Sequence, residues 1–405
     1  MGQHVERRWD GDPSANGSRK ARASFTYLAF VPDLVGQVEP RVTFTTSRSV
    51  FEAEDAIRSL NDLPSVAGIE AVAPMLLRAE AVGSSKIERL AVGHTNLARA
   101  LVDPGWARGT ARAVAANVRA LERAIELGAQ DRALTIDDLV QVHRILMSEE
   151  DPQGAGVIRT EQNRIGGRQP NPSDAAYIPP PAEEVPALLE DLVVFINRTD
   201  IPAIVQAGIG HAQFETIHPF ADGNGRVGRA LIHCVLRRRG LAPRFVPPIS
   251  VALGSRPETY VNGLVGYRNE GGIETWLGSF AEAARRSAEE SKQLAETVSS
   301  LEVRWFDLAG RPRATSTTAK ILALLPAQPI VTAATARLAS GTSYEAARGA
   351  LQSLESAGVV RQISGGVYDR TYAADELFAA VRALEERLAG RASGQAGHGK
   401  SKLIT

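Results

Sequence analysis

Residues 218–229 read HPFADGNGRVGR, and this stretch separates two kinds of fold. Within it, residues 223–228 match G-x-G-x-x-G, the pattern of a dinucleotide-binding turn. That turn follows a strand, and an acidic residue comes about 20 residues after it. Here residues 209–217, IGHAQFETI, are typical of a helix, and residues 236–256 contain no Asp or Glu. The pattern therefore does not indicate a dinucleotide-binding domain.

The loop nevertheless has the properties of a phosphate site. Gly223 and Gly225 allow positive φ angles, with which successive N–H groups point inward as an anion nest. The helix expected at 227–239 adds partial positive charge at its N-terminus. Arg226 and Arg229 lie at this end, where cations oppose the helix dipole, so a bound polyphosphate explains them better than a structural role does.

Two side chains in front of this nest can carry chemistry. His218 ends the preceding helical pattern, and a neutral imidazole can accept a proton from an alcohol near neutral pH. Asp222 stands at the mouth of the nest, where a carboxylate can hold Mg²⁺ against phosphate oxygens. A base, a metal-binding carboxylate and a phosphate nest together predict attack on a nucleotide phosphate.

HPFADGNGRVGR resembles the signature of the Fic family, H-x-F-x-[DE]-G-N-G-R-x-x-R, at every specified position. The resemblance implies a mainly α-helical bundle with a short β-hairpin flap, and transfer of AMP from ATP to a Ser, Thr or Tyr hydroxyl of a target protein or of the chain itself. His218 would take the hydroxyl proton, and Asp222 would hold Mg²⁺ against the α- and β-phosphates. Gly228 stands at an unspecified position, so we expect it to be incidental.

The same resemblance assigns the phosphate contacts. Gly223, Asn224 and Gly225 would cradle the phosphates of ATP. Arg226 would pair with them, and Arg229 would take the γ-phosphate. Pyrophosphate would leave, with the gain in rate coming from positioning and electrostatics.

Two more segments resemble parts of the family site. Residues 157–167 and 175–180 resemble the flap, which binds the target backbone by strand addition. Its expected working residues are Asn163, Arg164, Ile165, Gly166, Gly167, Tyr177, Ile178 and Pro179. Residues 256–272 resemble the segment that closes the adenine side, with Tyr260 and Asn269 as candidates. Ordinary core packing is an open alternative for Tyr260.

GSSKIERL, residues 83–90, resembles the inhibitory motif [ST]-x-x-x-E-[GN] of the family. Ser84 and Glu88 are four apart and so share one helix face. The resemblance implies that Glu88 pairs with Arg229 and blocks the γ-phosphate position. Arg89 departs from the motif, which leaves the strength of inhibition open, and a solvated helix residue is the alternative for Glu88.

The C-terminal residues 316–388 are similar to a winged helix, with three helices and then a β wing. The exposed candidates on the third helix have mixed charge, which is weak support for DNA binding. These candidates are Glu345, Arg348, Gln352 and Glu355. Protein docking or dimerisation is an equal alternative for this domain, and a homodimer is left open.

Bulk properties agree with a multi-domain globular protein. The chain has 405 residues, and 46 Lys and Arg balance 46 Asp and Glu, so no overall field points to nucleic acid or membrane. The single cysteine, Cys234, suits a reducing compartment, and no membrane-spanning run is visible, so a cytoplasmic protein without a membrane partner is expected. The expected organisation is a disordered tail at 1–24, a helical region at 25–130 with the inhibitory helix at about 78–92, a Fic core at 131–298, a linker at 299–315, the winged-helix-like domain at 316–388 and a second tail at 389–405.

The expected partners are therefore ATP, Mg²⁺ and a hydroxyl-bearing protein. Within the same fold, removal of AMP from a target with Glu88 positioning water, or use of another nucleotide donor, are alternatives. A winged-helix regulator whose Fic-like core only senses nucleotide is the alternative of a different class.

Overall fold

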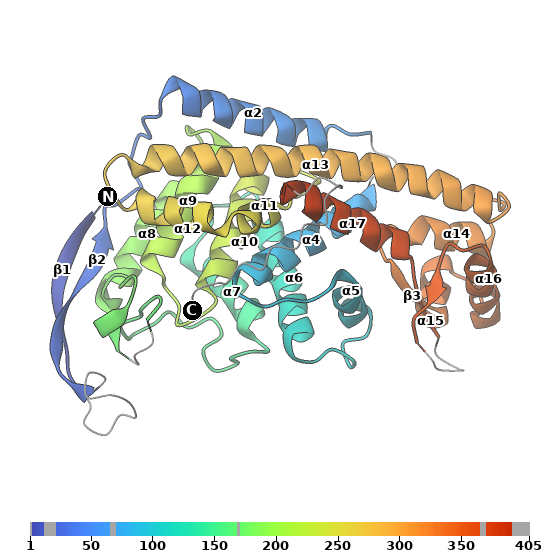
Figure 1. The fold of residues 1–405 in the computed structure, drawn as a ribbon, viewed down its shortest axis with the longest axis horizontal. Helices are drawn as coiled ribbons and strands as arrows, with labels where there is room; N and C mark the ends of the chain where they lie inside the picture. The colour runs from blue at the N-terminus through green and yellow to red at the C-terminus, as the bar shows by residue number, and fades with distance from the viewer. Residues whose placement is uncertain (1, 12–21, 65–69, 168–170, 365–369, 391–405) are drawn as a thin grey trace, which may run out of the picture.

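The computed structural model describes residues 2–11, 22–64, 70–167, 171–364 and 370–390. These residues are mainly α-helical with two small antiparallel sheets, which confirms the predicted fold class (Figure 1). Within these ranges, no helix has both the length and the apolar character needed to cross a membrane.

The core is built around one helix that is buried on all sides. This is α9, Ala203–Ile217, every residue of which is buried, as expected of a helix that has no polar face. Helix α10, Asn224–Arg238, packs against both α9 and α6, Gly109–Gly128. The turn between α9 and α10 holds the signature motif, so its position is set by two largely buried helices.

Short helices surround this pair. Helix α7, Ile136–Met147, begins at Thr135, whose side chain forms the capping box with Asp138 that the sequence predicts. The others are α8, Val185–Ile196, α11, Ile249–Ser255, α12, Pro257–Tyr267, and the 3₁₀ turns η1, Pro172–Asp174, and η2, Ala182–Glu184.

The N-terminal region adds a β-ribbon and, within the described ranges, a further group of helices. The helices are α2, Phe44–Asn61, α4, Val72–Ile87, α5, His94–Val102, and α6. The inhibitory helix expected at about 78–92 is thus the end of α4, which stops at Ile87 with Glu88 as its C-cap.

The expectation of a disordered tail at 1–24 is wrong for its first residues. Strand β1, Gly2–Trp9, pairs antiparallel with β2, Phe25–Pro32, over its whole length. The polar composition of β1 does not predict a strand, because β1 is ordered by pairing with a strand that comes later in the chain. Residues 12–21 of the predicted tail lie outside the described ranges, as do 391–405 of the second tail.

Helix α13, Gly272–Leu308, is the longest element, with 37 residues and a length of about 55 Å. In Figure 1 it runs between α2 and the other core helices and reaches the C-terminal unit. The first part of the linker expected at 299–315 is thus the end of this helix, and the domain boundary itself stays a prediction. Residues 299–308 contain no Gly or Pro and bury Trp305, so the helix continues through them.

The C-terminal unit contains α14, Thr317–Leu324, β3, Ile330–Thr332, α15, Ala333–Ser340, α16, Tyr344–Ser356, β4, Arg361–Gln362, β5, Thr371–Ala373, and α17, Asp375–Leu388. Its strands form an antiparallel sheet in the order β3-β5-β4. Helix α17 returns to α13, where the Trp305 indole N–H donates to Glu376 at 2.7 Å. The winged-helix assignment stays a prediction, and 365–369 in the expected wing lie outside the described ranges.

Candidate active site

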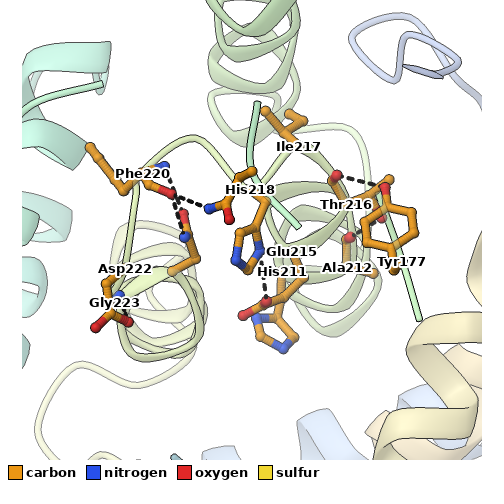
Figure 2. A network of polar contacts seen from close by, with 12 residues as sticks. Tyr177, His211, Ala212, Glu215, Thr216, Ile217, His218, Phe220, Asp222 and Gly223 are labelled. Carbon is orange, nitrogen blue, oxygen red and sulfur yellow. Dashed lines mark hydrogen bonds and ion pairs between the residues drawn. The ribbon is translucent and has the colours of Figure 1, made fainter. Parts of the chain in front are cut away.

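His218 caps the C-terminal end of α9 in the left-handed conformation, with φ 51° and ψ 62°. Such a backbone is strained for a residue with a Cβ and often marks a functional position. Burial lowers the pKa of the imidazole to about 4, so the ring is neutral at neutral pH. Its side chain is still 16% exposed, which leaves the base within reach of a substrate (Figure 2).

The loop after His218 is held by side chains that bond to its backbone. The Asn224 amide accepts from Phe220 N–H and donates to Phe220 C=O, both at 2.9 Å. His143 stacks on the Phe220 ring with centroids 3.7 Å apart and lies 3.1 Å from the Asp222 carbonyl oxygen. The Asn224 side chain therefore braces the loop instead of facing the phosphates, and only its backbone remains for the predicted cradle.

Gly223 and Gly225 lie where the predicted nest requires glycine. Gly223 has φ 75°, and a Cβ there would stand 2.9 Å from Met147 Sδ. At Gly225 a Cβ would stand 2.0 Å from a carboxylate oxygen of Glu88. The first N–H groups of α10 have no partner within the helix, as at any helix start. Only Gly223 has the positive φ predicted for the nest, because Gly225 belongs to the first turn of α10, and Glu88 packs directly against this turn.

The structure pairs Arg226 with a protein carboxylate. Its buried guanidinium forms an ion pair with Glu150, a residue that the sequence analysis does not single out. Glu150 thus occupies the guanidinium in this conformation, and the phosphate contact of Arg226 stays a prediction. Glu150 follows α7 and belongs to no sequence motif, so its pairing with Arg226 can be recognised only from the packing of α7 near α10.

Arg229 is the centre of the predicted inhibitory contact. It is buried, and its Nη2 lies 2.8 Å from Glu88 Oε1 and 2.9 Å from the Ser84 carbonyl oxygen, while Nε donates to Ser84 Oγ at 2.9 Å. Burial opposes ionisation of Glu88, but the charge of Arg229 and its hydrogen bond hold the pKa of Glu88 below the ordinary value. The structure brings Ser84 and Glu88 together on one helix face, as their spacing predicts, and places Arg229 against them, as the family resemblance implies.

A second contact of α4 anchors the body of this helix. Two turns before Glu88, the buried Glu80 carboxylate accepts from Ser250 N–H at 2.8 Å. Its other oxygen lies 2.9 Å from Nε2 of the buried His233 on α10. Glu80, Ser84 and Glu88 therefore form one polar stripe that α4 presents to α10 and α11.

Arg89 follows this stripe in the left-handed conformation, with φ 63°. Leu90 N–H donates to Ser85 C=O at 2.9 Å and Arg89 N–H to Lys86 C=O at 3.0 Å, which is the Schellman arrangement of a helix end. In that arrangement the residue after the C-cap is usually Gly or Asn, because a Cβ is unfavourable there. This explains why Gly or Asn is usual at this motif position.

We predict that Arg89→Gly is more stable than Arg89→Ala by about 1 kcal/mol, since alanine keeps the left-handed strain and glycine removes it. Both variants lose the same guanidinium, so their difference isolates the backbone effect. Urea unfolding of the two proteins measures it. Equal midpoints would show that the end of α4 is not strained at this residue.

His218, Glu88 and Arg229 share one cavity of about 610 Å³ with part of the flap and one face of α12. Tyr260 lines it, but its hydroxyl is buried between His211 Nε2, at 2.9 Å, and Arg229 Nη1, at 3.4 Å. Tyr260 thus lines the cavity, as predicted for a residue of the site, and is also buried, as its alternative of ordinary core packing predicts. Asn269 is exposed on the cavity rim, where its amide donates to Val265 C=O at 3.2 Å.

The predicted flap forms around one bridge between Ile165 and Tyr177. Gly166 and Gly167 follow Ile165 with φ 71° and 84°, as a turn requires. The Asn163 amide donates to Phe220 C=O at 2.9 Å, which ties the flap to the signature loop.

The other flap residues lie beside the N-terminal ribbon. Phe30 N–H of β2 donates to Ile178 C=O at 3.0 Å, so the ribbon occupies part of the flap edge. Tyr177 donates its hydroxyl to Thr216 C=O at 2.8 Å. Arg164 is half-buried, with its N–H 2.7 Å from Asn163 Oδ1, and Pro179 is buried.

Three residues near His218 were not predicted from the sequence. Arg159 is buried and donates to His218 C=O at 2.8 Å, and Arg268 lies 3.4 Å over the Tyr177 ring. Glu215 lies beside His218 on α9, with 3.9 Å between its Oε2 and His218 Nδ1. Only Glu215 could have been noticed in the sequence, because a charged residue within the otherwise apolar stretch QFETI of a helix is unusual.

The donor set at Asp222 fits Mg²⁺ that is shared with a nucleotide. Asp222 is exposed, and its Oδ1 accepts from Gly223 N–H at 2.6 Å, which leaves Oδ2 available. Within the part of the chain that is described, no group of three or more His, Cys, Asp or Glu forms a metal site. Mg²⁺ characteristically binds through one or two carboxylates with phosphates and water, so a single carboxylate beside the nest suits it.

Comparison with known proteins identifies this class of site. Residues 133–236 match the model of the Fic/DOC family. Protein adenylyltransferase fic-1 of Caenorhabditis elegans is 33% identical over 132 residues, which are 32% of this chain and 23% of that protein. Protein adenylyltransferase Fic of Drosophila melanogaster is 30% identical over 117 residues, 28% of this chain and 22% of that protein. The chain thus covers less than a quarter of these relatives.

Solved structures share the fold over a longer range. A Fic family protein from Desulfovibrio desulfuricans G20 aligns with a TM-score of 0.53 and 22% identity, over 83% of this chain and 98% of that chain. A Fic domain containing signaling protein from Bacteroides thetaiotaomicron VPI-5482 aligns with a TM-score of 0.51 and 19% identity, over 61% of this chain and 97% of that chain. Residues 133–236 are a Fic/DOC domain, and the family predicted from the signature motif is confirmed.

Proposed function

We propose that the chain is a protein adenylyltransferase, which moves AMP from ATP to a Ser, Thr or Tyr hydroxyl of a target protein or of itself. The main support is that one cavity holds a neutral imidazole, His218, and the N-terminal end of α10, with Arg229 on its wall. Curated relatives of the domain bear the name protein adenylyltransferase.

In this proposal each side chain has one task. His218 accepts the proton of the target hydroxyl, and the backbone N–H groups at Gly223–Gly225 bind the phosphates. Arg229 takes the γ-phosphate once Glu88 releases it. Asp222 would hold Mg²⁺, which would neutralise the phosphate charge as pyrophosphate leaves.

The contact of Glu88 with Arg229 supports autoinhibition as part of the proposal. The carboxylate occupies the Arg229 guanidinium and touches the position of a Gly225 Cβ, so it stands where an anionic phosphate would bind. Two like charges cannot share this site without loss of affinity. ATP in a productive position therefore requires Glu88 to move away.

The direct test compares ATP labelled at the α-phosphate with ATP labelled at the γ-phosphate. The full chain and its Glu88→Gly variant are incubated with Mg²⁺ and each nucleotide, and in parallel with the other nucleoside triphosphates labelled at the α-phosphate. We expect label on protein from the α-position only. Label from the γ-position would indicate a kinase, and the absence of label with every donor would reject transfer altogether.

We predict that Asp222→Asn raises the Mg²⁺ concentration needed for half-maximal transfer by about tenfold, which is 1.4 kcal/mol of binding. The amide keeps an oxygen for Gly223 N–H, so the loop stays in place while the charge is lost. A Mg²⁺ titration of transfer measures the shift, and an unchanged curve would remove Asp222 from the proposed metal site.

A further inference from the structure

One face of α9 carries three titratable side chains, His211, Glu215 and His218, spaced at i, i+4 and i+7. Within the described residues, His211 Nδ1, Glu215 Oε1 and His218 Nδ1 are buried atoms without a hydrogen bond of good geometry, and only the backbone of Gly228 and of Glu215 acts on the His211 and His218 rings, respectively. Buried polar atoms are normally paired, so three such atoms on one helix face call for an explanation. Figure 2 shows the Glu215 side chain between the two imidazoles.

Glu215 faces the nitrogen of His218 that is not needed as the base. Its Oε2 lies 3.9 Å from His218 Nδ1, and its backbone carbonyl also acts on this ring and raises the pKa of His218. An imidazole that accepts a proton at Nε2 must carry its own proton on Nδ1. The acceptors of Glu215 are placed to fix that tautomer.

Helix α10 makes room for this carboxyl at Gly228. A Cβ on Gly228 would stand 3.0 Å from Glu215 Oε1 and 3.1 Å from His211 Nδ1. A side chain at Gly228 would crowd Glu215 and His211, so this glycine favours the close approach of α9 and α10 although the motif leaves its position unspecified.

The charge around Glu215 comes from several elements. Burial raises the pKa of Glu215 to about 7, against the lowering effect of Arg229 and with a raising effect of Glu88. The titratable and charged groups that face Glu215 or His218 are Arg229, Glu88, Arg268, Arg159, Tyr260 and His211.

We propose that Glu215 is the positioning residue of His218: its ionised carboxylate holds the imidazole with the proton on Nδ1 and stabilises the imidazolium that forms during transfer. The proposal rests on the proposed function and deepens it. The hydroxyl proton of the target passes to His218 Nε2, and the oxygen forms a bond to the α-phosphorus. The bond from that phosphorus to the bridging oxygen breaks, and its electron pair leaves with pyrophosphate.

The proposal fixes the pH dependence of transfer. His218 is neutral above pH about 4, and Glu215 is ionised above pH about 7. Transfer should therefore rise with pH through about 7, as Glu215 loses its proton, and not through 4. Glu215→Gln has no proton to lose there, so its profile should be flat between pH 6 and 8.

The test uses the full chain with Glu88→Gly as background. We expect Glu215→Gln to lower kcat roughly tenfold or more, with little change in the KM for ATP. Glu215→Asp keeps a carboxylate and should keep the rise through neutral pH at a reduced rate. Glu296→Gln, a change at an exposed residue of α13, is the matched control and should transfer as the background does. A Glu215→Gln profile that keeps the background rate and rise overturns the proposal.

A second measurement does not depend on transfer. In spectra of ¹⁵N-histidine-labelled protein, the His218 signals are those missing from His218→Ala. We expect the His218 signals of the background protein to shift as the pH passes through about 7, where Glu215 ionises, and those of Glu215→Gln to stay unchanged between pH 6 and 8. If no variant transfers label, the proposed function fails, while His218 signals that respond to pH in Glu215→Gln as they do in the background protein reject the positioning role.

Discussion

Glu88→Gly is expected to raise transfer of α-label roughly 5- to 150-fold, the range of a 1–3 kcal/mol coupling between two sites. The reason is the 2.8 Å contact with Arg229, which has to break before that guanidinium can bind phosphate. Glu88 is the C-cap of α4 and its side chain is 40% exposed, so its loss leaves the core intact. The gain should appear as tighter ATP binding together with a higher kcat.

Lys86→Gly is the matched control for this change. Lys86 is exposed in the same last turn of α4, so glycine there loosens the helix without touching Arg229. It should leave transfer within a few-fold of the unchanged chain. If Lys86→Gly activates as strongly as Glu88→Gly, helix loosening and not the ion pair is responsible, and the inhibitory role of Glu88 is rejected.

His218→Ala in the Glu88→Gly background is expected to lower transfer roughly 10²- to 10⁴-fold, the usual effect of removing a general base. The imidazole is the neutral base on the cavity wall, and the phosphate nest of α10 does not depend on it. Titration calorimetry should therefore show nearly unchanged ATP affinity while label transfer is lost.

His94→Ala serves as the comparison. His94 contacts Glu385 at 2.9 Å at the start of α5, away from the cavity, and its replacement should not reduce transfer. Transfer by His218→Ala at the background rate would show that the hydroxyl proton leaves by another route, and would remove His218 from the mechanism.

Most of the candidate site residues could be predicted from the sequence because they lie close together in the chain. His218, Asp222 and the glycines lie within one turn, and turn geometry follows from residue type. The inhibitory contact was predictable as well, since Ser84 and Glu88 share a helix face. Family resemblance supplied their partner, Arg229, which no local rule could place.

The remaining features depend on contacts between distant segments. No sequence pattern around Arg226 predicts its ion pair with Glu150. The Asn224 side chain bonds to the Phe220 backbone, which comes within hydrogen-bond distance only in the folded turn. Strand β1 was missed for the same reason, because a strand is stabilised by its partner and not by its own composition. Gly228 acquires a role only once α9 lies against α10.

The two ends of the polar stripe on α4 differ in a way that matters for regulation. Glu80 is fully buried against His233, whereas the last turn ends in a left-handed Arg89. A helix with a fixed body and a strained end frays at that end first. In the proposed autoinhibition, Glu88 would be released by the opening of a single turn while α4 stays in the bundle, so the free energy of switching would be that of a local fluctuation and not of a domain rearrangement.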